Sequence, residues 1–465
     1  MAEPDTTAHE TVGDGVPSRV HLVGVGGAGM SAIARILAQR GHDVSGSDLH
    51  DGRAVHALRA LGVRVAVGHA PEHIDGAAVV VTSTAVPQAN PEVVAAQARG
   101  VPVVPRAEML AAVLAGDRSV LVAGTHGKTT TTAMTVVALH AAGIDPTFAI
   151  GGELNEAGTN AHAGSDRIAV AEADESDRSF LAYAPDVAVV TNLELDHPEV
   201  YRDLDDVVET FAAFVTRVRP GGSLVACVDD PGVRALLARV DVDAVTYGTS
   251  PDADVRLVAG PDGTDLVVEG VAHPLRLAVP GHHNLLNAAA AVTSARLVGA
   301  EVEAAIEGVE RYRGTARRFQ LIGEAGGVTV VDDYAHHPTE LRATLAAART
   351  TGPARIVCVV QPHRYSRTAV LGEELGRAAA GADLVIVTEV YGAGEPAVPG
   401  VNGLLVARAA EAAGAVVRYE PHLGEVPALL ASEVREGDLV LVTGAGDVTQ
   451  VGPGLLSILG GDGGG

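Results

Sequence analysis

Short apolar runs rich in β-branched residues recur along the chain, and each is followed by a glycine or polar turn and then by a stretch rich in Ala, Leu and Arg. This alternation predicts parallel α/β sheets, because two parallel strands need a helical crossover between them. Two blocks of this kind fill the first half of the sequence. Their expected strands are residues 20–25, 43–46, 78–82 and 101–104 in the first block and residues 119–123, 168–172 and 187–191 in the second.

The second half continues the pattern with one change. Residues 224–279 alternate apolar and polar positions between Gly and Asp turns, which is closer to antiparallel pairing. A helix is expected at residues 284–297, an arginine-rich junction covers residues 311–318, and a third block begins near Phe319. The expected strands of this block are residues 328–331, 355–360, 384–388 and 439–443.

A chain of 465 residues is too long for a single hydrophobic core. We therefore expect an α/β protein of three domains, with Rossmann-like sheets at both ends and a mixed sheet of the P-loop type in the centre. The expected bounds are residues 19–116, 117–316 and 317–458, flanked by a disordered N-terminus at residues 1–18 and a flexible tail at residues 459–465.

Charge and aromatic content narrow the function classes. The formal net charge of −25 argues against binding to nucleic acid or anionic membranes, and a 3% aromatic content without Trp leaves little for base stacking. Cys227 and Cys358 stand in apolar strand-like runs and are expected to be buried thiols. No targeting or membrane-spanning segment is expected. The interpretation is a cytoplasmic protein, either a monomer or a homodimer.

A first glycine-rich loop follows the first expected strand. Gly24, Gly26 and Gly29 form a G-x-G-x-x-G pattern before a helix, and Asp48 ends the next strand. Taken alone, this pattern is typical of an NAD site. The geometry requires only a diphosphate at a helix N-terminus, however, and a UDP-sugar carries the same diphosphate and ribose. The loop therefore predicts binding of some nucleotide diphosphate.

A second glycine-rich loop, Gly-Thr-His-Gly-Lys-Thr-Thr, joins an apolar strand to a helix and holds the only lysine among 33 Lys and Arg residues. Its first glycine is one residue closer than in the usual G-x-x-x-x-G-K-[ST]. Backbone N–H groups would still cradle phosphates, Lys128 would bridge the outer two, and the Thr129 hydroxyl could bind Mg²⁺. The expected nucleotide triphosphate contacts are Gly124, Thr125, His126, Gly127, Lys128, Thr129 and Thr130.

Acidic runs follow two expected strands of the same block. Residues 172–177 contain four carboxylates, and residues 191–197 contain Glu194, Asp196 and His197. Solvated loops are a common fate for such runs. Because parallel strands place their carboxyl ends at one sheet edge, and Mg²⁺ prefers hard oxygen ligands, these runs beside a phosphate loop favour a metal site.

Four further motifs complete an ordered set. They are Pro-Gly-His-His-Asn-Leu-Leu-Asn at residues 280–287, Arg-Arg-Phe at 317–319, Asp-Asp-Tyr-Ala-His-His-Pro-Thr-Glu at 332–340 and Gln-Pro-His-Arg-Tyr-Ser-Arg at 361–367. With this set the chain resembles the Mur ligases, the ATP-dependent amino-acid ligases of peptidoglycan precursor synthesis, over roughly residues 20–453. Residues 361–367 and the first glycine loop are similar to the branch that adds L-alanine to UDP-N-acetylmuramate.

The resemblance implies three domains that bind, in order, UDP-N-acetylmuramate, ATP and the amino acid L-alanine. It implies that Lys128 offsets charge on the γ-phosphate, that Thr129 and Glu172 hold one Mg²⁺, and that His197 binds a second. The implied contacts of the UDP substrate are Gly24, Gly26, Gly27, Gly29, Met30, Asp48 and Ser83. The resemblance assigns Asn284 and Asn287 to adenine, Arg318 to a phosphate, Asp333 to nucleotide positioning, and His336, Arg364 and Arg367 to the alanine carboxylate and the intermediate.

Several neighbouring residues carry lesser expectations. Of the adjacent His282 and His283, at most one should point into a pocket, and His337 is expected to have a structural role at a helix start. Glu194 and Asp196 are expected to support the metal site or to be solvated. A carbamylated lysine, which bridges metals in some relatives, is excluded because no second lysine exists. Residues 444–447 are expected to form a structural turn.

Three alternatives remain open from the sequence. A dehydrogenase would use the first glycine loop and Asp48 but leaves the Lys128 loop unexplained. A regulatory or scaffold protein would keep the loops but would not need Glu172, His197 and Arg364. Within the resembled family, a recycling ligase that adds a preformed peptide to UDP-N-acetylmuramate differs mainly in residues 361–367.

Overall fold

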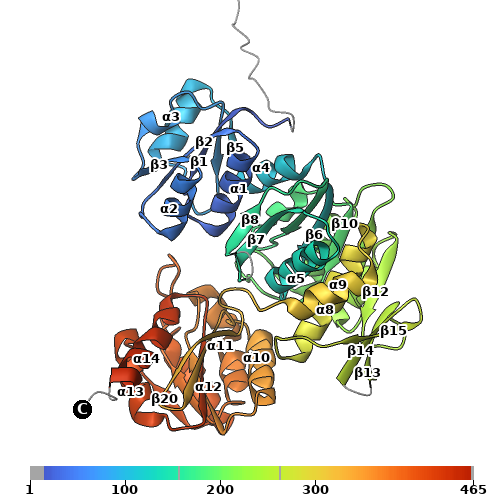
Figure 1. The fold of residues 1–465 in the computed structure, drawn as a ribbon. Coiled ribbons are helices and arrows are strands. Elements are labelled where there is room, and N and C mark those ends of the chain that lie inside the picture. Colours follow the sequence, from blue (N-terminus) through green and yellow to red (C-terminus); the bar gives the residue numbers. More distant parts are fainter. Residues whose placement is uncertain (1–14, 156–157, 261–262, 462–465) are drawn as a thin grey trace, which may run out of the picture. The chain divides into compact units, whose positions relative to one another are not determined.

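Each of the three α/β blocks forms one sheet in the computed structural model, which describes residues 15–155, 158–260 and 263–461 (Figure 1). The chain divides into two compact units. The first contains Met1–Leu193, Val208–Leu275 and Ala288–Arg311, and the second contains Glu194–Val207, Arg276–Asn287 and the chain from Tyr312 onward. The first unit holds the N-terminal and central sheets, and the second holds the C-terminal sheet.

The N-terminal sheet is parallel throughout and has the strand order β3-β2-β1-β4-β5. Its strands are β1 (Arg19–Val23), β2 (Asp43–Asp48), β3 (Arg64–Val67), β4 (Val79–Thr82) and β5 (Val103–Pro105). Its helices are α1 (Ala28–Gln39), α2 (Arg53–Ala60), η1 (Pro71–Ile74), α3 (Pro91–Arg99) and α4 (Arg106–Leu114). The strand order reverses between β1 and β4, and such a switch point is where open α/β sheets bind ligands. The loop after β1 lies there.

The central sheet has ten strands in the order β15-β14-β13-β12-β11-β10-β6-β9-β7-β8. The strands are β6 (Arg118–Ala123), β7 (Thr147–Leu154), β8 (Thr159–His162), β9 (Ile168–Glu172), β10 (Val187–Val190), β11 (Ser223–Cys227), β12 (Ala244–Gly248), β13 (Val255–Gly260), β14 (Gly263–Val268) and β15 (Val271–Leu275). The helices are α5 (Lys128–Ala141), η2 (Ser179–Ala182), α6 (Leu204–Val215), α7 (Pro231–Leu237), α8 (His282–Leu297) and α9 (Val302–Arg311).

The expectation of antiparallel pairing from residue 224 onward is wrong for its first half. Strands β11, β12 and β13 continue the sheet in parallel, and only β13, β14 and β15 pair antiparallel. Helix α7 crosses over between β11 and β12, which allows the parallel register. Gly and Asp turns on their own therefore did not distinguish a hairpin from a short crossover.

The C-terminal sheet has the order β16-β17-β21-β18-β19-β20, and it is parallel except for its edge strand β16. Its strands are β16 (Gln320–Ala325), β17 (Val328–Asp333), β18 (Arg355–Val360), β19 (Leu384–Val387), β20 (Val417–Tyr419) and β21 (Asp438–Thr443). Its helices are α10 (Pro338–Thr350), α11 (Tyr365–Ala379), α12 (Gly403–Ala412), η3 (Leu423–Glu425), α13 (Val426–Glu433), η4 (Asp447–Gln450) and α14 (Val451–Gly461).

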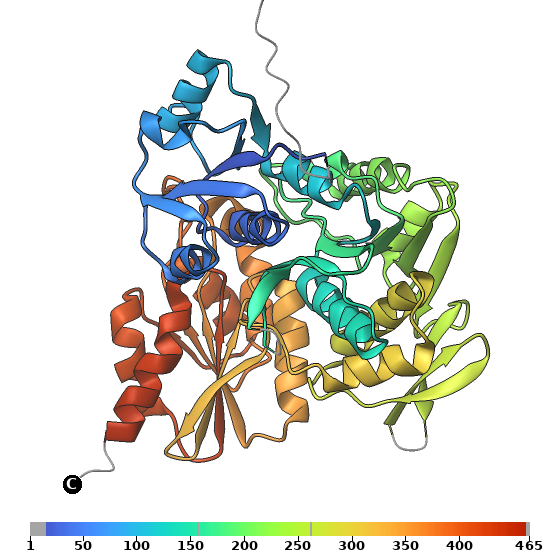
Figure 2. The ribbon, with the colours of Figure 1, turned by 45° about the horizontal axis from the view of Figure 1, so that its top comes forward.

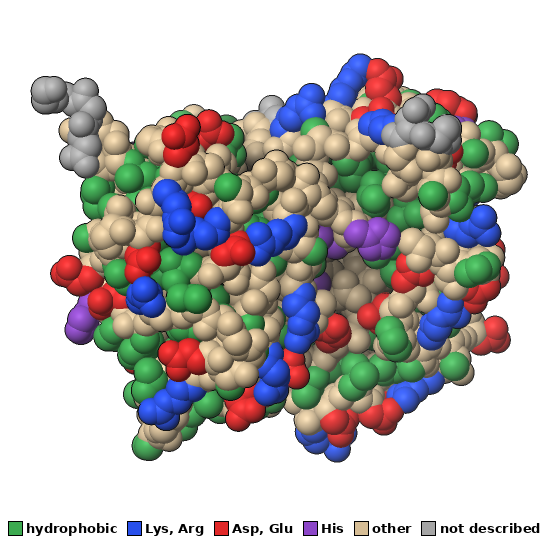
Figure 3. Space-filling model, turned by 90° about the horizontal axis from the view of Figure 1, so that it is seen from below, with side chains coloured by type: hydrophobic (Ala, Val, Ile, Leu, Met, Phe, Trp, Pro, Cys, Tyr) green, Lys and Arg blue, Asp and Glu red, His purple; other side chains and the backbone are tan. Residues whose placement is uncertain are grey.

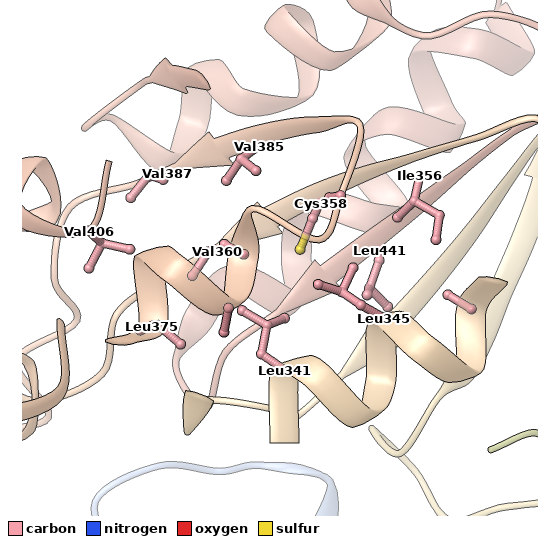
Figure 4. Close-up of a cluster of buried hydrophobic side chains, with 14 of the residues drawn as sticks. Leu341, Leu345, Ile356, Cys358, Val360, Leu375, Val385, Val387, Val406 and Leu441 are labelled. Atoms are coloured by element: carbon pink, nitrogen blue, oxygen red, sulfur yellow. The ribbon is translucent and has the colours of Figure 1, made fainter. Parts of the chain in front are cut away.

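Apolar residues line both faces of the C-terminal sheet. One core lies under α10, α11 and α12, and Figure 4 shows Cys358 inside it beside Leu341 and Leu441. The other core lies under α13 and α14, the red helices of Figure 2. Cys358 and Cys227 are both buried and free, as expected, and burial raises the pKa of the Cys358 thiol to about 12. Neither thiol is a reactive nucleophile.

The ends of the chain are more ordered than expected where the structure describes them. Val16 is 1% exposed, and α14 extends to Gly461, so residues 15–18 and 459–461 do not belong to loose tails. The remainder of both expected tails lies outside the described residues. No helix among the described residues has the length and apolar character needed to cross a bilayer. Acidic and basic side chains are interspersed on the face shown in Figure 3.

Candidate functional site

The first glycine loop is held by the end of β2. The carbonyl of Ser47 accepts hydrogen bonds from Gly24 N–H at 2.8 Å and Val25 N–H at 2.9 Å, and Asp48 Oδ2 accepts one from Gly26 N–H at 2.9 Å. Gly24 has φ +73°, a conformation that favours glycine. Asp48 thus shapes the loop directly. Gly27 caps α1 without any side-chain hydrogen bond, which leaves the first helical N–H groups for an anion.

The other expected contacts of the UDP substrate differ in what they can offer. The Met30 side chain is 3% exposed and packs in the core, so only its backbone faces a ligand. Ser83 follows β4, and its carbonyl accepts a hydrogen bond from Val86 N–H. Arg106, which the sequence did not single out, lies beside Gly29: a Cβ atom on that glycine would be 2.7 Å from the Arg106 guanidinium. A cation at this helix start suits a diphosphate.

The second glycine loop joins β6 to α5 and is braced by the end of β10. Asn192 accepts hydrogen bonds from Thr125 N–H, through its carbonyl, and from His126 N–H, through its side chain, at 2.9 and 2.8 Å. Thr191 Oγ1 donates to the His126 carbonyl at 2.6 Å. The amide groups of Thr125 and His126 are therefore used within the protein. The open N–H groups are those at the start of α5, where Gly127, at φ +81°, provides no side-chain cap.

Gly124 cannot be replaced without moving the loop. Its φ is +131°, and a Cβ atom would lie 2.1 Å from Thr191 Oγ1. We expect Gly124→Ala to raise the KM for ATP more than about tenfold, because the loop would lose its positioned geometry. Gly143→Ala is the matched control, since Gly143 also has positive φ but nothing within 4 Å of the added atom. Equal KM values in steady-state assays of the two variants would contradict this assignment.

The Lys128 ammonium is held at the mouth of the loop. Nζ donates to the Gly124 carbonyl at 2.7 Å, to the Thr125 carbonyl at 3.1 Å and to Glu175 Oε1 at 2.9 Å. Burial of the ammonium lowers its pKa, but the carboxylates of Glu175, Asp174 and Glu172 raise it more, so the pKa of Lys128 lies above its usual value. The side chain is charged at neutral pH and aimed where phosphates would sit.

Thr129 and Glu172 come together as the sequence predicted. Thr129 Oγ1 donates to Glu172 Oε2 at 3.1 Å, and Gly151 N–H donates to Glu172 Oε1. A hydroxyl and a carboxylate at one sheet edge are hard oxygen donors of the kind that Mg²⁺ takes beside a nucleotide. The donor set therefore fits Mg²⁺. Asp174 lies farther along the same turn, 3.6 Å from Arg106 Nη2, and its pKa is lowered: burial would raise it, but Lys128 outweighs this effect.

The second unit carries the remaining candidates. Asn284 and Asn287 are both buried and share one face at the start of α8, and Asn287 Nδ2 donates to Asn284 Oδ1 at 3.3 Å. Asn284 Nδ2 donates to the Pro280 carbonyl at 2.7 Å. His282 is exposed and His283 is half-buried, in agreement with the expectation that at most one would turn inward.

Asp333 and Arg318 lie around the end of β17. Asp333 is 7% exposed, and its carboxylate accepts hydrogen bonds from Phe319 N–H and Ala335 N–H, both at 2.7 Å. Burial raises the pKa of Asp333 to about 6, against the opposing charge of Arg318. The Arg318 guanidinium stacks over the Tyr334 ring, 4.9 Å from its centroid. Its Nη1 lies 3.8 Å from Glu340 Oε1, a loose ion pair at the edge of the cation by which a guanidinium also binds phosphate.

His336 and His337 separate into two roles. His337 is the N-cap of α10 and forms a capping box with Glu340, which confirms its structural role. The Nδ1 atom of His336 lies 2.9 Å from the Tyr334 carbonyl, so this nitrogen carries the proton and Nε2 has the free lone pair. Burial lowers the pKa of His336 to about 4. The imidazole is neutral at pH 7 and can accept a hydrogen bond at Nε2.

Arg364 and Arg367 are not equivalent. The Arg367 guanidinium makes a bidentate pair with Asp196, with Nε–Oδ1 at 2.7 Å and Nη2–Oδ2 at 3.2 Å, and both side chains are nearly buried. The expectation that Asp196 could be solvated is therefore wrong. Arg364 is 35% exposed and lies 3.4 Å from both Glu199 and Glu395, so it is the arginine that can turn toward a carboxylate.

His197 stands on a strained turn next to that pair. Its φ is +55°, which is uncommon for a residue other than glycine, and its carbonyl accepts hydrogen bonds from Val200 N–H and Tyr201 N–H. Its Nδ1 lies 3.1 Å from Glu199 Oε1, and Asp196 Oδ1 accepts a hydrogen bond from its backbone N–H. Glu194 accepts a hydrogen bond from Thr339 Oγ1 at 2.7 Å. The turn is fixed from both sides.

Family models cover nearly all of the chain in three consecutive matches. Residues 19–118 match the model described as Mur ligase family, catalytic domain; residues 122–295 match the Mur ligase middle domain; and residues 317–446 match the Mur ligase, glutamate ligase domain. The sequence placed the domain borders at 116/117 and 316/317, and these exact bounds remain predictions.

Curated relatives match from end to end. The chain is 49% identical over 462 residues to a UDP-N-acetylmuramate–L-alanine ligase from Mycobacterium sp. (strain JLS), with 95% of each chain covered, and 48% identical to the enzyme of that name from Nocardia farcinica, with 94% of each covered. Among solved structures, UDP-N-acetylmuramate-alanine ligase from Thermotoga maritima has a TM-score of 0.78 at 29% identity, covering 95% of this chain and 98% of that one. The chain belongs to the Mur ligase family.

Proposed function

We propose that the protein joins L-alanine to the lactyl carboxylate of UDP-N-acetylmuramate with cleavage of ATP to ADP and phosphate, in peptidoglycan precursor synthesis. The observation that carries this proposal is the near half identity, along 95% of the chain, to ligases with that named activity. The phosphate loop and its lysine supply the matching chemistry. The carboxylate attacks the γ-phosphate to give an acyl phosphate, and the amino group of alanine then displaces phosphate.

The first step depends on positioning and charge. The N–H groups at the start of α5 bind phosphate oxygens, and the Lys128 ammonium offsets the charge that develops on the transferred γ-phosphoryl group. Thr129 and Glu172 would hold Mg²⁺, whose charge would offset that of the phosphates. Arg318 and Asp333 position the nucleotide, and the diphosphate of the UDP substrate binds at the start of α1.

The second step needs a neutral amine. L-alanine enters as an ammonium ion and loses a proton before it attacks. The His336 imidazole, neutral at pH 7 because burial lowers its pKa to about 4, offers Nε2 as the acceptor of a hydrogen bond from the amino group. Arg364 binds the alanine carboxylate. Arg367 is already paired with Asp196 and holds the His197 turn in place. We also propose a cytoplasmic location, because the reaction uses ATP and a nucleotide-linked substrate.

The assignment is tested by phosphate release from the purified protein. We expect release only when ATP, Mg²⁺, UDP-N-acetylmuramate and L-alanine are all present. The first step needs ATP and UDP-N-acetylmuramate to form the acyl phosphate, and phosphate is released only when L-alanine displaces it in the second step. Single omissions are the controls, and the product should carry one alanine by mass spectrometry. Equal turnover with D-glutamate in place of L-alanine would remove the substrate assignment.

The recycling ligase is the alternative within the family. A murein peptide ligase from Psychrobacter arcticus shares the fold, with a TM-score of 0.71 at 24% identity over 95% of this chain and 98% of that one. A tripeptide replacing L-alanine distinguishes the two activities, and we expect no turnover with it. The dehydrogenase alternative is not supported, because Asp48 is engaged by the loop and by His50 N–H.

A further inference from the structure

A carboxylate is buried in the centre of the N-terminal domain. Glu92, in the first turn of α3, is 0% exposed. Ser47 Oγ donates to its Oε2 at 2.5 Å, and the His73 imidazole lies 2.7 Å from its Oε1. His21 and His69 stand at 3.4 and 3.5 Å from Oε2. The three histidines come from β1, from the turn after β3 and from η1, so one carboxylate joins four elements.

The hydrogen bonds around Glu92 require one arrangement of protons. An ionised carboxylate only accepts, so His73 Nδ1 and His21 Nε2 donate to it, and Ala70 N–H donates to its Oε1 at 3.3 Å. The Ser47 hydroxyl donates a hydrogen bond to Glu92, and its oxygen accepts one from His69 Nδ1 at 2.9 Å. Each of the three imidazoles donates toward Glu92, directly or through Ser47.

The charge on Glu92 is stabilised where it lies. Burial alone would raise the pKa of Glu92, but hydrogen bonds from His21, Ser47 and His73 lower it to about 2. The carboxylate also stands in the first turn of α3, where the helix dipole favours an anion. Glu92 is therefore ionised throughout the neutral range, and its donors are ordered around a fixed negative charge.

Ser47 connects this buried cluster to the first glycine loop. Its side chain is held by Glu92 and His69, while its carbonyl accepts the N–H groups of Gly24 and Val25. The next residue, Asp48, accepts the N–H of Gly26. Three successive amides of the loop are thus oriented by two residues of β2. Ser47 is fixed in position, because its buried hydroxyl is hydrogen-bonded to both Glu92 and His69.

We propose that Glu92, acting through Ser47, is a positioning residue that sets the geometry of the glycine loop for the diphosphate of the UDP substrate. The inference rests on the proposed function, since it takes the UDP substrate as the ligand of that loop. Glu92 itself is fully buried, and it acts through Ser47 and not by direct contact with the ligand. Its role is to fix the Ser47 carbonyl, and so the direction in which the helix α1 amides point.

The test is a comparison of Michaelis constants for the two nucleotides. Glu92→Gln replaces an acceptor oxygen by an amide that must face donors, so we expect the KM for UDP-N-acetylmuramate to rise about tenfold. The KM for ATP and kcat at saturating substrates should stay within about twofold, because the phosphate loop lies in another sheet. Ser47→Ala keeps the charge but removes the link, and it should give the same split.

Matched controls separate positioning from general weakening. Glu72→Gln makes the same change at an exposed site. Val93→Ala weakens α3 beside Glu92 without touching the carboxylate. Both variants should leave the KM for UDP-N-acetylmuramate near the wild-type value, with thermal melting recording any loss of stability.

The outcomes are distinct. If Glu92→Gln does not fold, Ser47→Ala decides alone. The proposal is overturned if both variants leave the KM for UDP-N-acetylmuramate unchanged, or if Val93→Ala with a similar fall in Tm raises it equally. Calorimetric titration of the wild-type protein with UDP-N-acetylmuramate is the reference: absence of binding there would count against the proposed function and not against the role of Glu92.

Discussion

Replacing Lys128 by arginine is expected to lower kcat by at least about a hundredfold while the protein stays folded. The ammonium is a compact charge between two loop carbonyls and Glu175, all within 3.1 Å of Nζ. A planar guanidinium is wider and cannot make this set of contacts and also reach a γ-phosphate oxygen. The loss should appear in the ATP-dependent step, as reduced phosphate release under saturating substrates.

Folding of the Lys128→Arg variant is checked by circular dichroism and thermal melting. Because the chain has no other lysine, the matched control is the reverse exchange at an exposed position, Arg99→Lys, where the arginine meets Asp75 at the surface. That variant should keep wild-type turnover, since exposed ion pairs contribute little. Near-normal turnover in Lys128→Arg would remove this residue from the mechanism.

Arg367→Ala is expected to destabilise the second unit by about 3–5 kcal/mol, because it leaves the Asp196 carboxylate buried without its partner. The Arg367 guanidinium holds the pKa of Asp196 well below its usual range, against the effect of burial. Without it, burial raises the pKa of Asp196, so the lost interaction appears as lost stability. The measurement is the fall in Tm, or in the denaturant midpoint, of the transition that reports on the C-terminal sheet.

Arg364→Ala provides the contrast, since both arginines were expected from the sequence to bind the alanine carboxylate. Arg364 is partly exposed and paired only at 3.4 Å, so its loss should leave Tm nearly unchanged and raise the KM for L-alanine about tenfold. The double variant Asp196→Ala/Arg367→Ala should be less destabilised than the sum of its parts. Similar KM and Tm effects in the two single arginine variants would contradict this division of roles.

The sheets were predictable where strands are buried and apolar. β1, β6, β9, β18 and β21 were found from runs of β-branched residues, because central parallel strands are covered on both faces. Strands with weaker patterns were not. β3 and β20 are edge strands, of which β3 is half-exposed and β20 has only three residues, and β7 contains Gly151 and Gly152. Their pairing depends on the neighbouring strand more than on their own composition.

The candidate site divides in the same way. Lys128, Thr129 and Glu172 were predictable because a glycine loop and a strand end have fixed places in a parallel sheet. Asp196 and Arg367 are 171 positions apart in the sequence, and no local sequence pattern predicts their ion pair. The cluster around Glu92 could not be predicted from the sequence either, since His21 and Ser47 occupy ordinary strand positions. Such contacts exist only once the sheets have formed.

The solitary lysine has a practical consequence for the chemistry of the whole surface. Amine-directed reagents such as active esters and aldehydes find no other ε-amino group in the chain. The one they find is largely covered, 17% exposed, and stays protonated because of its carboxylate neighbours. Acylation at high pH therefore amounts to labelling the phosphate loop alone, apart from the chain's α-amino group. Lys128 is therefore the one ε-amino group available for labelling, and bound nucleotide would protect it from the reagent.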